Sequence, residues 1–322
     1  MAIYTKINKK NILYIEKIFQ IGKIISFKGI KKGIENTNYL LKTKNEKYIL
    51  TIFGKRVDKR DIPFFMNLMD RINSKKINCP KPIINKKGKN FFNIKKKPAA
   101  IVSFVDGKDK KKLNKNDCYM IGKNIAKFHN ISKKIKLYRK NSMSLDSWSI
   151  ILNKIGNSCN SIYPSLKVLM KTNLKDIKNK WPKKLPKGII HGDLFIDNIF
   201  FKKNKFHGYI DFYFASNDFF MYEIAICINA LCFDKKKRKF IFNRKKSKNL
   251  IKGYSSIRKL SIKEKKSLNI LCRGAALRYL LTRTYDYLNT PKSAIIKLKN
   301  PREYIQKLNI HDKLNSFRDY YN

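Results

Sequence analysis

The sequence predicts an α+β protein of two lobes, with a small antiparallel β-sheet in residues 1–106 and a mainly helical region in residues 107–322. Strand patterns rich in β-branched and aromatic residues crowd into the first region, whereas apolar residues at helical spacing dominate the second. A polar loop around residue 193 lies between short apolar strands inside the helical region. With 322 residues, each lobe is large enough to bury a core of its own, and the lysine-rich segment 108–115 is the expected boundary.

The first lobe is expected to be a small antiparallel sheet with one helix against it. Apolar residues at helical spacing predict an opening helix over residues 8–20. A second helix over residues 61–76 would be capped at Asp58 or Asp61 and has Pro63 in its first turn. Strands are expected over residues 24–30, 38–43, 48–53 and 98–105.

The second lobe is expected to be mainly helical, with a few short strands. Its helices are predicted from apolar positions that recur every three or four residues. They cover residues 116–130, 145–154, 164–179, 218–232, 244–257 and 262–288. Short apolar runs predict strands over residues 188–190, 199–201 and 207–210.

The loop between the first two of these short strands carries the strongest chemical signal. It holds His191, Asp193 and Asn198, and the third strand ends at Asp211. Phosphoryl transfer needs such a set, because one carboxylate faces the acceptor hydroxyl while an amide and a second carboxylate hold Mg²⁺ against the phosphates. A lone His-x-Asp is usually a turn with a hydrogen-bonded carboxylate. The full order, however, matches the kinase catalytic loop followed by a strand-terminal metal-binding Asp, and it favours a kinase-type site.

A turn rich in glycine and asparagine separates the first two predicted strands. It contains Gly29, Gly33, Asn36 and Asn38. Such a turn can lay its backbone N–H groups over phosphates, although most turns of this composition only reverse the chain. The polar loop around residue 193 supports the interpretation of this turn as a nucleotide-binding feature.

The formal net charge of +52 raises the question of a polyanionic partner. The lysines are spread through nearly every segment, and no nucleic-acid recognition motif accompanies them. Lys, Ile and Asn are abundant together, which indicates compositional bias rather than dedicated nucleic-acid binding. No specific nucleic-acid partner is therefore expected.

The cysteines and the apolar runs indicate a soluble protein of a reducing compartment. The six cysteines contain no C-x-x-C pair and no visible disulfide framework. The N-terminus lacks the apolar region of a signal peptide, and the longest mostly apolar run, residues 224–233, is too short to cross a bilayer. A cytoplasmic location without membrane attachment is expected, and the sequence indicates no particular oligomeric state.

Several long runs, in order from residue 26 to residue 283, resemble the aminoglycoside-phosphotransferase-like kinases, a branch of the protein-kinase-like fold. The resemblance tightens to the members of that family that act on L-homoserine. It implies ATP and Mg²⁺ as cofactors and transfer of the γ-phosphate to the side-chain hydroxyl of L-homoserine, a step of threonine biosynthesis. The runs that carry it are residues 26–30, 33–38, 48–51, 55–57, 63–65, 98–107, 191–201, 210–218 and 273–283.

The motif and the resemblance together assign roles at the site. Asp193 is expected to accept the hydrogen bond of the acceptor hydroxyl, with His191 orienting the loop. Asn198 and Asp211 are expected to bind Mg²⁺ between the phosphate oxygens. Adenine is expected against backbone groups of residues 103–105. The residues expected to contact the nucleotide are Gly29, Gly33, Asn36, Asn38, Lys55, Ser103 and Val105.

Two residues depart from the wider kinase pattern. Thr51 stands where a strand lysine normally reaches the α- and β-phosphates, so that either Lys55, Arg56 or the loop alone would have to serve. Tyr213 stands where protein kinases have the Gly that follows Asp-Phe. A bulky residue there argues against a flipping activation segment, and a constitutively assembled enzyme is expected.

The proposed acceptor is a zwitterion, so its pocket needs a cation for the carboxylate and an acceptor for the ammonium. Arginine offers a bidentate fork for a carboxylate. Arg273, Arg278 and Arg283 lie on one predicted helix at spacings that spread them around its surface. Arg278 and Arg283 are the candidates for the carboxylate, and Tyr213 and Asp218 for the ammonium. Asp218 can equally well cap the helix that follows it.

Two other functions fit part of this pattern. One is a related small-molecule kinase for choline, an amino sugar or a thiosugar, of which the choline enzyme would need an aromatic cage rather than a carboxylate partner. The other is a non-catalytic basic protein that binds nucleic acid on the same scaffold. The intact set of Asp193, Asn198 and Asp211 argues against a loss of catalysis.

Overall fold

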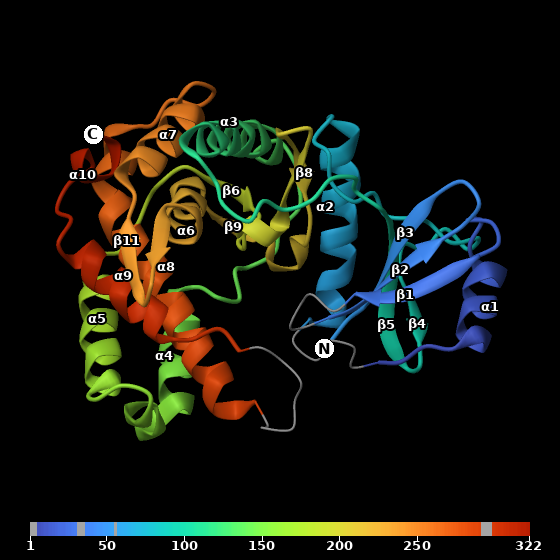
Figure 1. Cartoon of the computed structure of the whole chain (residues 1–322), viewed down its shortest axis with the longest axis horizontal. Helices are drawn as coiled ribbons and strands as arrows, with labels where there is room; N and C mark the ends of the chain where they lie inside the picture. The colour runs from blue at the N-terminus through green and yellow to red at the C-terminus, as the bar shows by residue number, and fades with distance from the viewer. Residues whose placement is uncertain (1–4, 31–35, 55–56, 291–297) are drawn as a thin grey trace. The chain divides into compact units, whose positions relative to one another are not determined.

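The structure is a computed structural model of the chain, and it describes residues 5–30, 36–54, 57–290 and 298–322 (Figure 1). The described residues form two compact units. The first unit holds the chain up to Gly107 together with Gly208–Tyr213, and the second holds Lys108–His207 and most of the chain from Phe214 onward.

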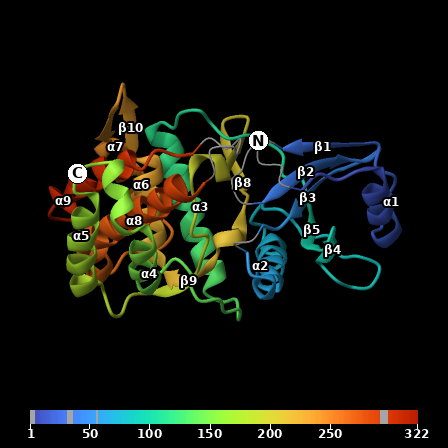
Figure 2. The same ribbon diagram turned by 90° about the horizontal axis from the view of Figure 1, so that it is seen from below.

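The first unit is built on a five-stranded antiparallel sheet in the order β1-β2-β3-β5-β4. The expected strands of this lobe are confirmed, and β4 adds a short edge strand. The strands are β1 (Ser26–Ile30), β2 (Thr37–Lys42), β3 (Lys47–Ile52), β4 (Phe92–Ile94) and β5 (Lys97–Ser103). Helices α1 (Lys9–Ile18) and α2 (Ile62–Ser74) lie on opposite sides of this sheet (Figures 1 and 2).

Helix α1 covers the side of the sheet to which every second residue of the strands points. Ile12 and Ile15 of α1 pack in one buried cluster with Tyr39, Leu41 and Leu50. Because side chains alternate along a strand, the same alternation leaves Asn38 and Thr51 on the other side of the sheet. Those two polar residues face each other across the β2–β3 pair, where the sequence places the candidate nucleotide site.

Helix α2 begins where the sequence predicts a cap. The Asp58 side chain accepts a hydrogen bond of 2.9 Å from the Arg60 N–H and so starts a 3₁₀ turn, Lys59–Asp61, that runs into the helix. Pro63 stands in the first turn of α2, where its missing N–H has no cost. The helix buries an apolar face that includes Phe65, Leu68, Met69 and Ile72.

The segment Gly208–Tyr213 joins the first unit through close backbone packing. The Tyr209 N–H donates to the Asn78 carbonyl at 3.1 Å. A Cβ at position 208 would lie 2.4 Å from the same carbonyl oxygen, so only glycine allows this approach. Asp211, which ends the predicted third strand of the motif, is thereby held on the first unit.

The second unit is mainly helical, as expected, and is organised around α8. This long helix packs against α4, α5, α6 and α9 (Figure 2). A capping box between Ser261 and Glu264 fixes its start, because each residue's side chain accepts a hydrogen bond from the other's backbone N–H. The helices are α3 (Lys115–Ser132), α4 (Leu145–Ile155), α5 (Leu166–Lys180), α6 (Phe220–Leu231), α7 (Arg244–Ser255), α8 (Ile262–Asn289), α9 (Arg302–Asp312) and α10 (Arg318–Tyr321).

Three two-stranded sheets interrupt the helices, and two of them contain strands that the sequence does not predict. The strands are β6 (Lys187–Ile190) with β9 (Ser216–Phe219), β7 (Ile199–Lys202) with β8 (Lys205–Tyr209), and β10 (Phe233–Lys236) with β11 (Lys239–Phe242). The expected helix start at residue 218 is therefore wrong. Pairing of Asp218 with Gly188 holds this stretch extended, and α6 begins at Phe220.

All six cysteines are buried and free. Within the described ranges, no helix has the length and apolar character needed to cross a membrane.

Candidate active site

The loop between β6 and β7 is held in shape by a glycine and by a buried strand. Ile189 and Ile190 of β6 are fully buried. Gly192 then has φ +77°, and a Cβ there would lie 2.8 Å from the Phe214 carbonyl oxygen. A residue with a side chain would be strained in this conformation and would also collide with the backbone. The sharp turn leaves Asp193 as the next residue, partly exposed.

Glu223 of α6 holds the start of this loop by hydrogen bonds. Its side chain is fully buried and accepts hydrogen bonds from the backbone N–H groups of His191 and Gly192. Burial raises the pKa of Glu223, while His191 and the two N–H groups act in the opposite direction. Sequence reasoning missed this residue. The signal was a single acidic residue inside an otherwise apolar helix, because such a group is tolerated only with partners.

Asp193 is held from two sides. The Asn198 side-chain N–H₂ group donates to the Asp193 carbonyl at 2.8 Å and to Asp193 Oδ2 at 3.3 Å. The Tyr279 hydroxyl, from α8, donates to Asp193 Oδ1 at 3.2 Å. Burial raises the pKa of the Asp193 carboxyl, and the positive charges of Arg278 and Lys299 work against that rise. The neutral donors thus orient the carboxylate, and the nearby cations lower its pKa.

Asn198 and Asp211 carry the ligand types that Mg²⁺ prefers. The 3₁₀ turn Ile196–Asn198 brings Asn198 back toward Asp193, and its Nδ2 atom is used there. Its Oδ1 atom has no hydrogen-bond partner among the residues that the structure describes, so this oxygen is available to coordinate a metal ion. Asp211, on the first unit, follows β8 with φ +65°. Asp adopts this left-handed conformation more readily than most residues do, and observed backbone strain is common at functional sites.

Thr51 occupies the strand-lysine position as part of a neutral network. Its hydroxyl donates to Asn38 Oδ1 at 2.8 Å and accepts from the Tyr213 hydroxyl at 3.3 Å. The Tyr213 ring packs edge-on against Phe53 and Phe65, with centroids 5.0 and 5.8 Å away. Burial raises the pKa of Tyr213, so its hydroxyl stays protonated and keeps donating. Tyr213 therefore completes the packing of the first unit.

The remaining nucleotide candidates lie on the same unit. Gly29 is on β1 opposite Tyr39, and Asn36 Oδ1 accepts from the Gly54 N–H at 3.1 Å. Ser103 exchanges hydrogen bonds with the backbone of Lys81, through its own N–H and through its side chain. The expected contacts at Gly33 and Lys55, and the alternative at Arg56, lie outside the described residues.

The backbone N–H of Val105 differs from those of Ser103 and Phe104. The N–H groups of Ser103 and Phe104 donate to the carbonyls of Lys81 and Lys47. No acceptor for the Val105 N–H is found in the part of the chain that the structure describes. A purine edge can supply one.

The three arginines of α8 face different surroundings, as their spacing predicts. Arg278 is only 3% exposed and donates to the Gly192 carbonyl at 3.0 Å, which connects α8 to the β6–β7 loop. Arg283 is 8% exposed and pairs with Glu303 at 2.6 Å.

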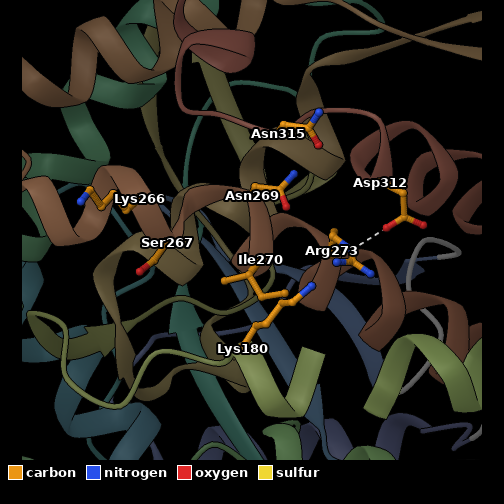
Figure 3. A pocket seen from close by; sticks show the side chains of 8 residues that line it. All are labelled: Lys180, Lys266, Ser267, Asn269, Ile270, Arg273, Asp312 and Asn315. Carbon is orange, nitrogen blue, oxygen red and sulfur yellow. Dashed lines mark ion pairs between the residues drawn. The ribbon is translucent and has the colours of Figure 1, made fainter. Parts of the chain in front are cut away.

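Arg273 lines a separate pocket of about 440 Å³ on the second unit, where it pairs with Asp312 (Figure 3). Arg273 also pairs with Asp176. None of the candidate catalytic residues lines this pocket. The pocket residues are Lys180, Lys266, Ser267, Asn269, Ile270, Arg273, Asp312 and Asn315.

Asp218 does not cap a helix. Its Oδ1 atom accepts from the Phe219 N–H at 2.7 Å, and its Oδ2 atom accepts from the Asn141 side chain at 2.6 Å. Helix α6 has Phe219 at its N-cap position and no side-chain cap. The helix-cap alternative for Asp218 is therefore wrong. Burial raises its pKa, and the two hydrogen bonds favour the charged form.

Comparison with known proteins gives the class and then the particular group. Residues 26–239 match the model of the phosphotransferase enzyme family, and the chain belongs to that family. It is 40% identical over 320 residues to the homoserine kinase of Allorhizobium ampelinum, and the alignment covers 99% of both chains. The homoserine kinases of Brucella anthropi and Agrobacterium fabrum are each 38% identical over 320 residues, with 97% and 98% of those chains covered. Within the family, the chain belongs with the homoserine kinases.

Solved structures share the fold at low identity. Amicoumacin kinase hAmiN, in complex with AMP-PNP, Ca²⁺ and Ami, has a TM-score of 0.74 at 14% identity, with 97% of this chain and 95% of that chain covered. A microcompartment-associated aminopropanol kinase has a TM-score of 0.68 at 14% identity, covering 96% of this chain and 98% of that chain. These likenesses confirm the predicted two-lobed, protein-kinase-like fold.

Proposed function

We propose that this protein transfers the γ-phosphate of ATP to the side-chain hydroxyl of L-homoserine, giving O-phospho-L-homoserine and ADP for threonine biosynthesis. The observation that carries the proposal is the carboxylate of Asp193, held between Asn198 and Tyr279 on the loop where the family motif expects it. The full-length relatives, all named homoserine kinase, support the choice of acceptor.

Asp193 would accept the hydrogen bond of the homoserine hydroxyl and aim its oxygen at the γ-phosphorus. A bond forms between this oxygen and phosphorus while the bond to the β–γ bridging oxygen breaks, and the hydroxyl proton passes to Asp193. Because the transition state of phosphoryl transfer is loose, orientation contributes more than basicity does. The two donors on Asp193 serve this purpose, since they restrict its rotation. Glu223 acts behind them by accepting hydrogen bonds from the His191 and Gly192 N–H groups of the loop backbone, and His191 stays a prediction as the residue that orients the loop.

The chain's ligand types fit a metal–nucleotide cofactor. Asn198 Oδ1 and the Asp211 carboxylate would hold Mg²⁺, which neutralises charge on the phosphate oxygens when bound. The Val105 N–H would meet the adenine edge, with Ser103 next to it. The β1–β2 turn with Gly29, Gly33, Asn36 and Asn38 would lie over the phosphates, and Lys55 stays a prediction there.

The residues that bind the carboxylate and the ammonium group of the acceptor remain predictions. Arg278 and Arg283 were predicted for the carboxylate, and Tyr213 and Asp218 for the ammonium group. Asp218 keeps this prediction, since its carboxylate is oriented by Asn141 and lies on the same unit as the catalytic loop. Cytoplasmic location also stays a prediction.

An ADP-release assay over a panel of acceptors tests the proposed function. The panel is L-homoserine, L-serine, choline, methylthioribose and an aminoglycoside, each with and without Mg²⁺. We expect Mg²⁺-dependent turnover that is fastest with L-homoserine, and a phosphorus NMR signal of a phosphate monoester in the product. Preferred turnover of choline or a sugar would replace homoserine as the substrate. Absence of turnover with every acceptor would contradict the proposed kinase activity.

A further inference from the structure

The acceptor carboxylate needs a cation close to Asp193, and the arginines of α8 are already engaged. Arg278 is buried with its guanidinium on the Gly192 carbonyl, and Arg283 is paired with Glu303. Arg273 is paired twice, with Asp176 and with Asp312. Moving Arg278 toward a substrate would remove a hydrogen bond from the carbonyl of the buried Gly192, which is costly. Moving Arg273 or Arg283 would break existing ion pairs with partly exposed carboxylates.

Lys299 is a cation that has no ion pair with the described residues. It is exposed and stands just before α9. Its ammonium nitrogen lies 4.8 Å from the centroid of the Phe195 ring. No carboxylate of the described residues lies within ion-pairing distance of it, whereas the neighbouring Glu303 is taken by Arg283 and Lys307. An exposed cation–π contact is weak, so a carboxylate can take the ammonium group without loss of a strong interaction.

A short chain of contacts connects Lys299 to the reacting carboxylate. Phe195 follows Asp193 by two positions in the loop, and its ring meets the Tyr279 ring edge-on at 5.0 Å. The Tyr279 hydroxyl in turn binds Asp193. The charge of Lys299 also acts on Asp193, where it opposes the effect of burial on the pKa. Lys299 therefore stands at the exposed side of the catalytic loop, within electrostatic range of the catalytic carboxylate.

We infer that Lys299 binds the α-carboxylate of the acceptor and so selects amino-acid alcohols over simple amino alcohols. The inference rests on the proposed function. Homoserine is short, so when its hydroxyl faces Asp193 its carboxylate must lie only a few bonds away. A lysine on a flexible stem can follow a ligand over that span, and the Phe195 face keeps the ammonium group near the loop while the site is empty.

Kinetics on paired substrates tests this role. The variants are Lys299→Met, which keeps an apolar stem but removes the charge, Lys299→Arg, and Lys313→Met as a matched exposed lysine at the other end of α9. The substrates are L-homoserine and 3-amino-1-propanol, which has a hydrogen in place of the carboxylate. L-2-Aminobutyrate, which lacks only the hydroxyl, serves as a competitive inhibitor.

We expect Lys299→Met to lower kcat/KM for L-homoserine by about 10- to 100-fold, mainly through KM, as loss of a charge-assisted hydrogen bond implies. The inhibition constant of L-2-aminobutyrate should rise by a similar factor. The KM for ATP, and turnover or inhibition by 3-amino-1-propanol, should stay unchanged. Lys299→Arg should recover most of the loss, and Lys313→Met should behave as the native protein does.

Other outcomes overturn the inference in distinguishable ways. If native protein phosphorylates L-homoserine and Lys299→Met does so equally well, Lys299 is not the carboxylate-binding residue. An equal loss with both substrates, or a raised KM for ATP, would place Lys299 at the phosphates or in the fold instead. Failure of the native protein to use L-homoserine would count against the proposed function itself.

Discussion

The Tyr279 hydroxyl donates a hydrogen bond of 3.2 Å to Asp193 Oδ1, on the opposite side of the carboxylate from Asn198. Tyr279 belongs to α8 and Asp193 to the β6–β7 loop, so the contact joins two elements far apart in the chain. Burial keeps the pKa of Tyr279 well above its ordinary value, and the hydroxyl therefore remains a donor at every working pH. A hydrogen bond to a carboxylate favours the charged form.

Tyr279→Phe removes this donor while keeping the ring. We expect kcat to fall by about tenfold, because a hydrogen bond to a charged group contributes about 1.5–3 kcal/mol and Asn198 still orients the carboxylate. The pKa of Asp193 should rise without the donor. Since the proposed mechanism uses Asp193 as the carboxylate, the acidic limb of the kcat/KM profile should move to higher pH, which a purely structural role would not produce.

Tyr304→Phe is the matched control for that substitution. The Tyr304 ring lies 5.2 Å from the Tyr279 ring, is fully buried, and its hydroxyl has no hydrogen-bond partner among the described residues. Its removal should leave both kcat and the pH profile unchanged. An identical pH shift in the two variants would mean that Tyr279 acts through packing and not through its hydroxyl.

Asp193→Asn keeps the shape of the side chain but removes its charge and basicity. We expect turnover to fall by about 10²- to 10⁴-fold, the usual contribution of a positioned general base, while ATP binds nearly as before. Single-turnover assays together with nucleotide titration measure the two effects separately. Near-native turnover in a folded variant would remove Asp193 from its proposed role.

Asp211→Ala should abolish Mg²⁺-dependent nucleotide binding, and Asn198→Ala should weaken it less. A carboxylate contributes a full charge to a metal site, whereas an amide contributes only a dipole. Calorimetric titration with ATP, in the presence and absence of Mg²⁺, checks the order of the two effects. Unchanged Mg²⁺-dependent affinity in the Asp211 variant would contradict its assignment as a ligand.

The strands and helices with clear periodicity were predictable, and those fixed by pairing alone were not. In the first unit, β2 alternates buried and more exposed residues, whereas β5 is an almost continuous buried run. Helices α3 to α8 carry apolar faces, and these patterns predict the elements. β9, with the sequence Ser-Asn-Asp-Phe, has no such pattern and is extended only because it pairs with β6. The predicted elements also stopped at residue 288, whereas α9 places Tyr304 beside Tyr279 and Glu303 beside Arg283.

The candidate site was predictable where a short motif carries it and unpredictable where distant segments meet. Asp193, Asn198 and Asp211 lie close together in the sequence, so their order alone predicts the motif. Tyr279 and Glu223 contact the loop from α8 and α6, and nothing in the spacing of the sequence indicates such a contact. Nor does the sequence indicate what replaces the strand lysine, since one partner of Thr51 is Tyr213, which lies much later in the chain and joins the first unit.

The net charge of +52 yields the last prediction, and the structure decides which lysines can test it. A test that neutralises Lys110, Lys111 and Lys112 together would mix two effects. Lys110 pairs with Asp117 at 2.7 Å, and the Asp117 side chain is only 3% exposed. Removing Lys110 would leave that carboxylate buried without its cation and would destabilise the fold.

Lys111→Gln with Lys112→Gln avoids that cost, since both side chains are exposed. If the charge reflects compositional bias, this double variant should phosphorylate L-homoserine as the native protein does. Binding to DNA or RNA should be weak, indifferent to sequence, and lost steeply as salt rises, because it rests on counterion release. Competition binding at about 0.15 M salt, where the Debye length is about 8 Å, measures this. Tight and sequence-selective binding at that salt, without turnover of any small hydroxyl acceptor, would instead identify a nucleic-acid-binding protein on a kinase scaffold.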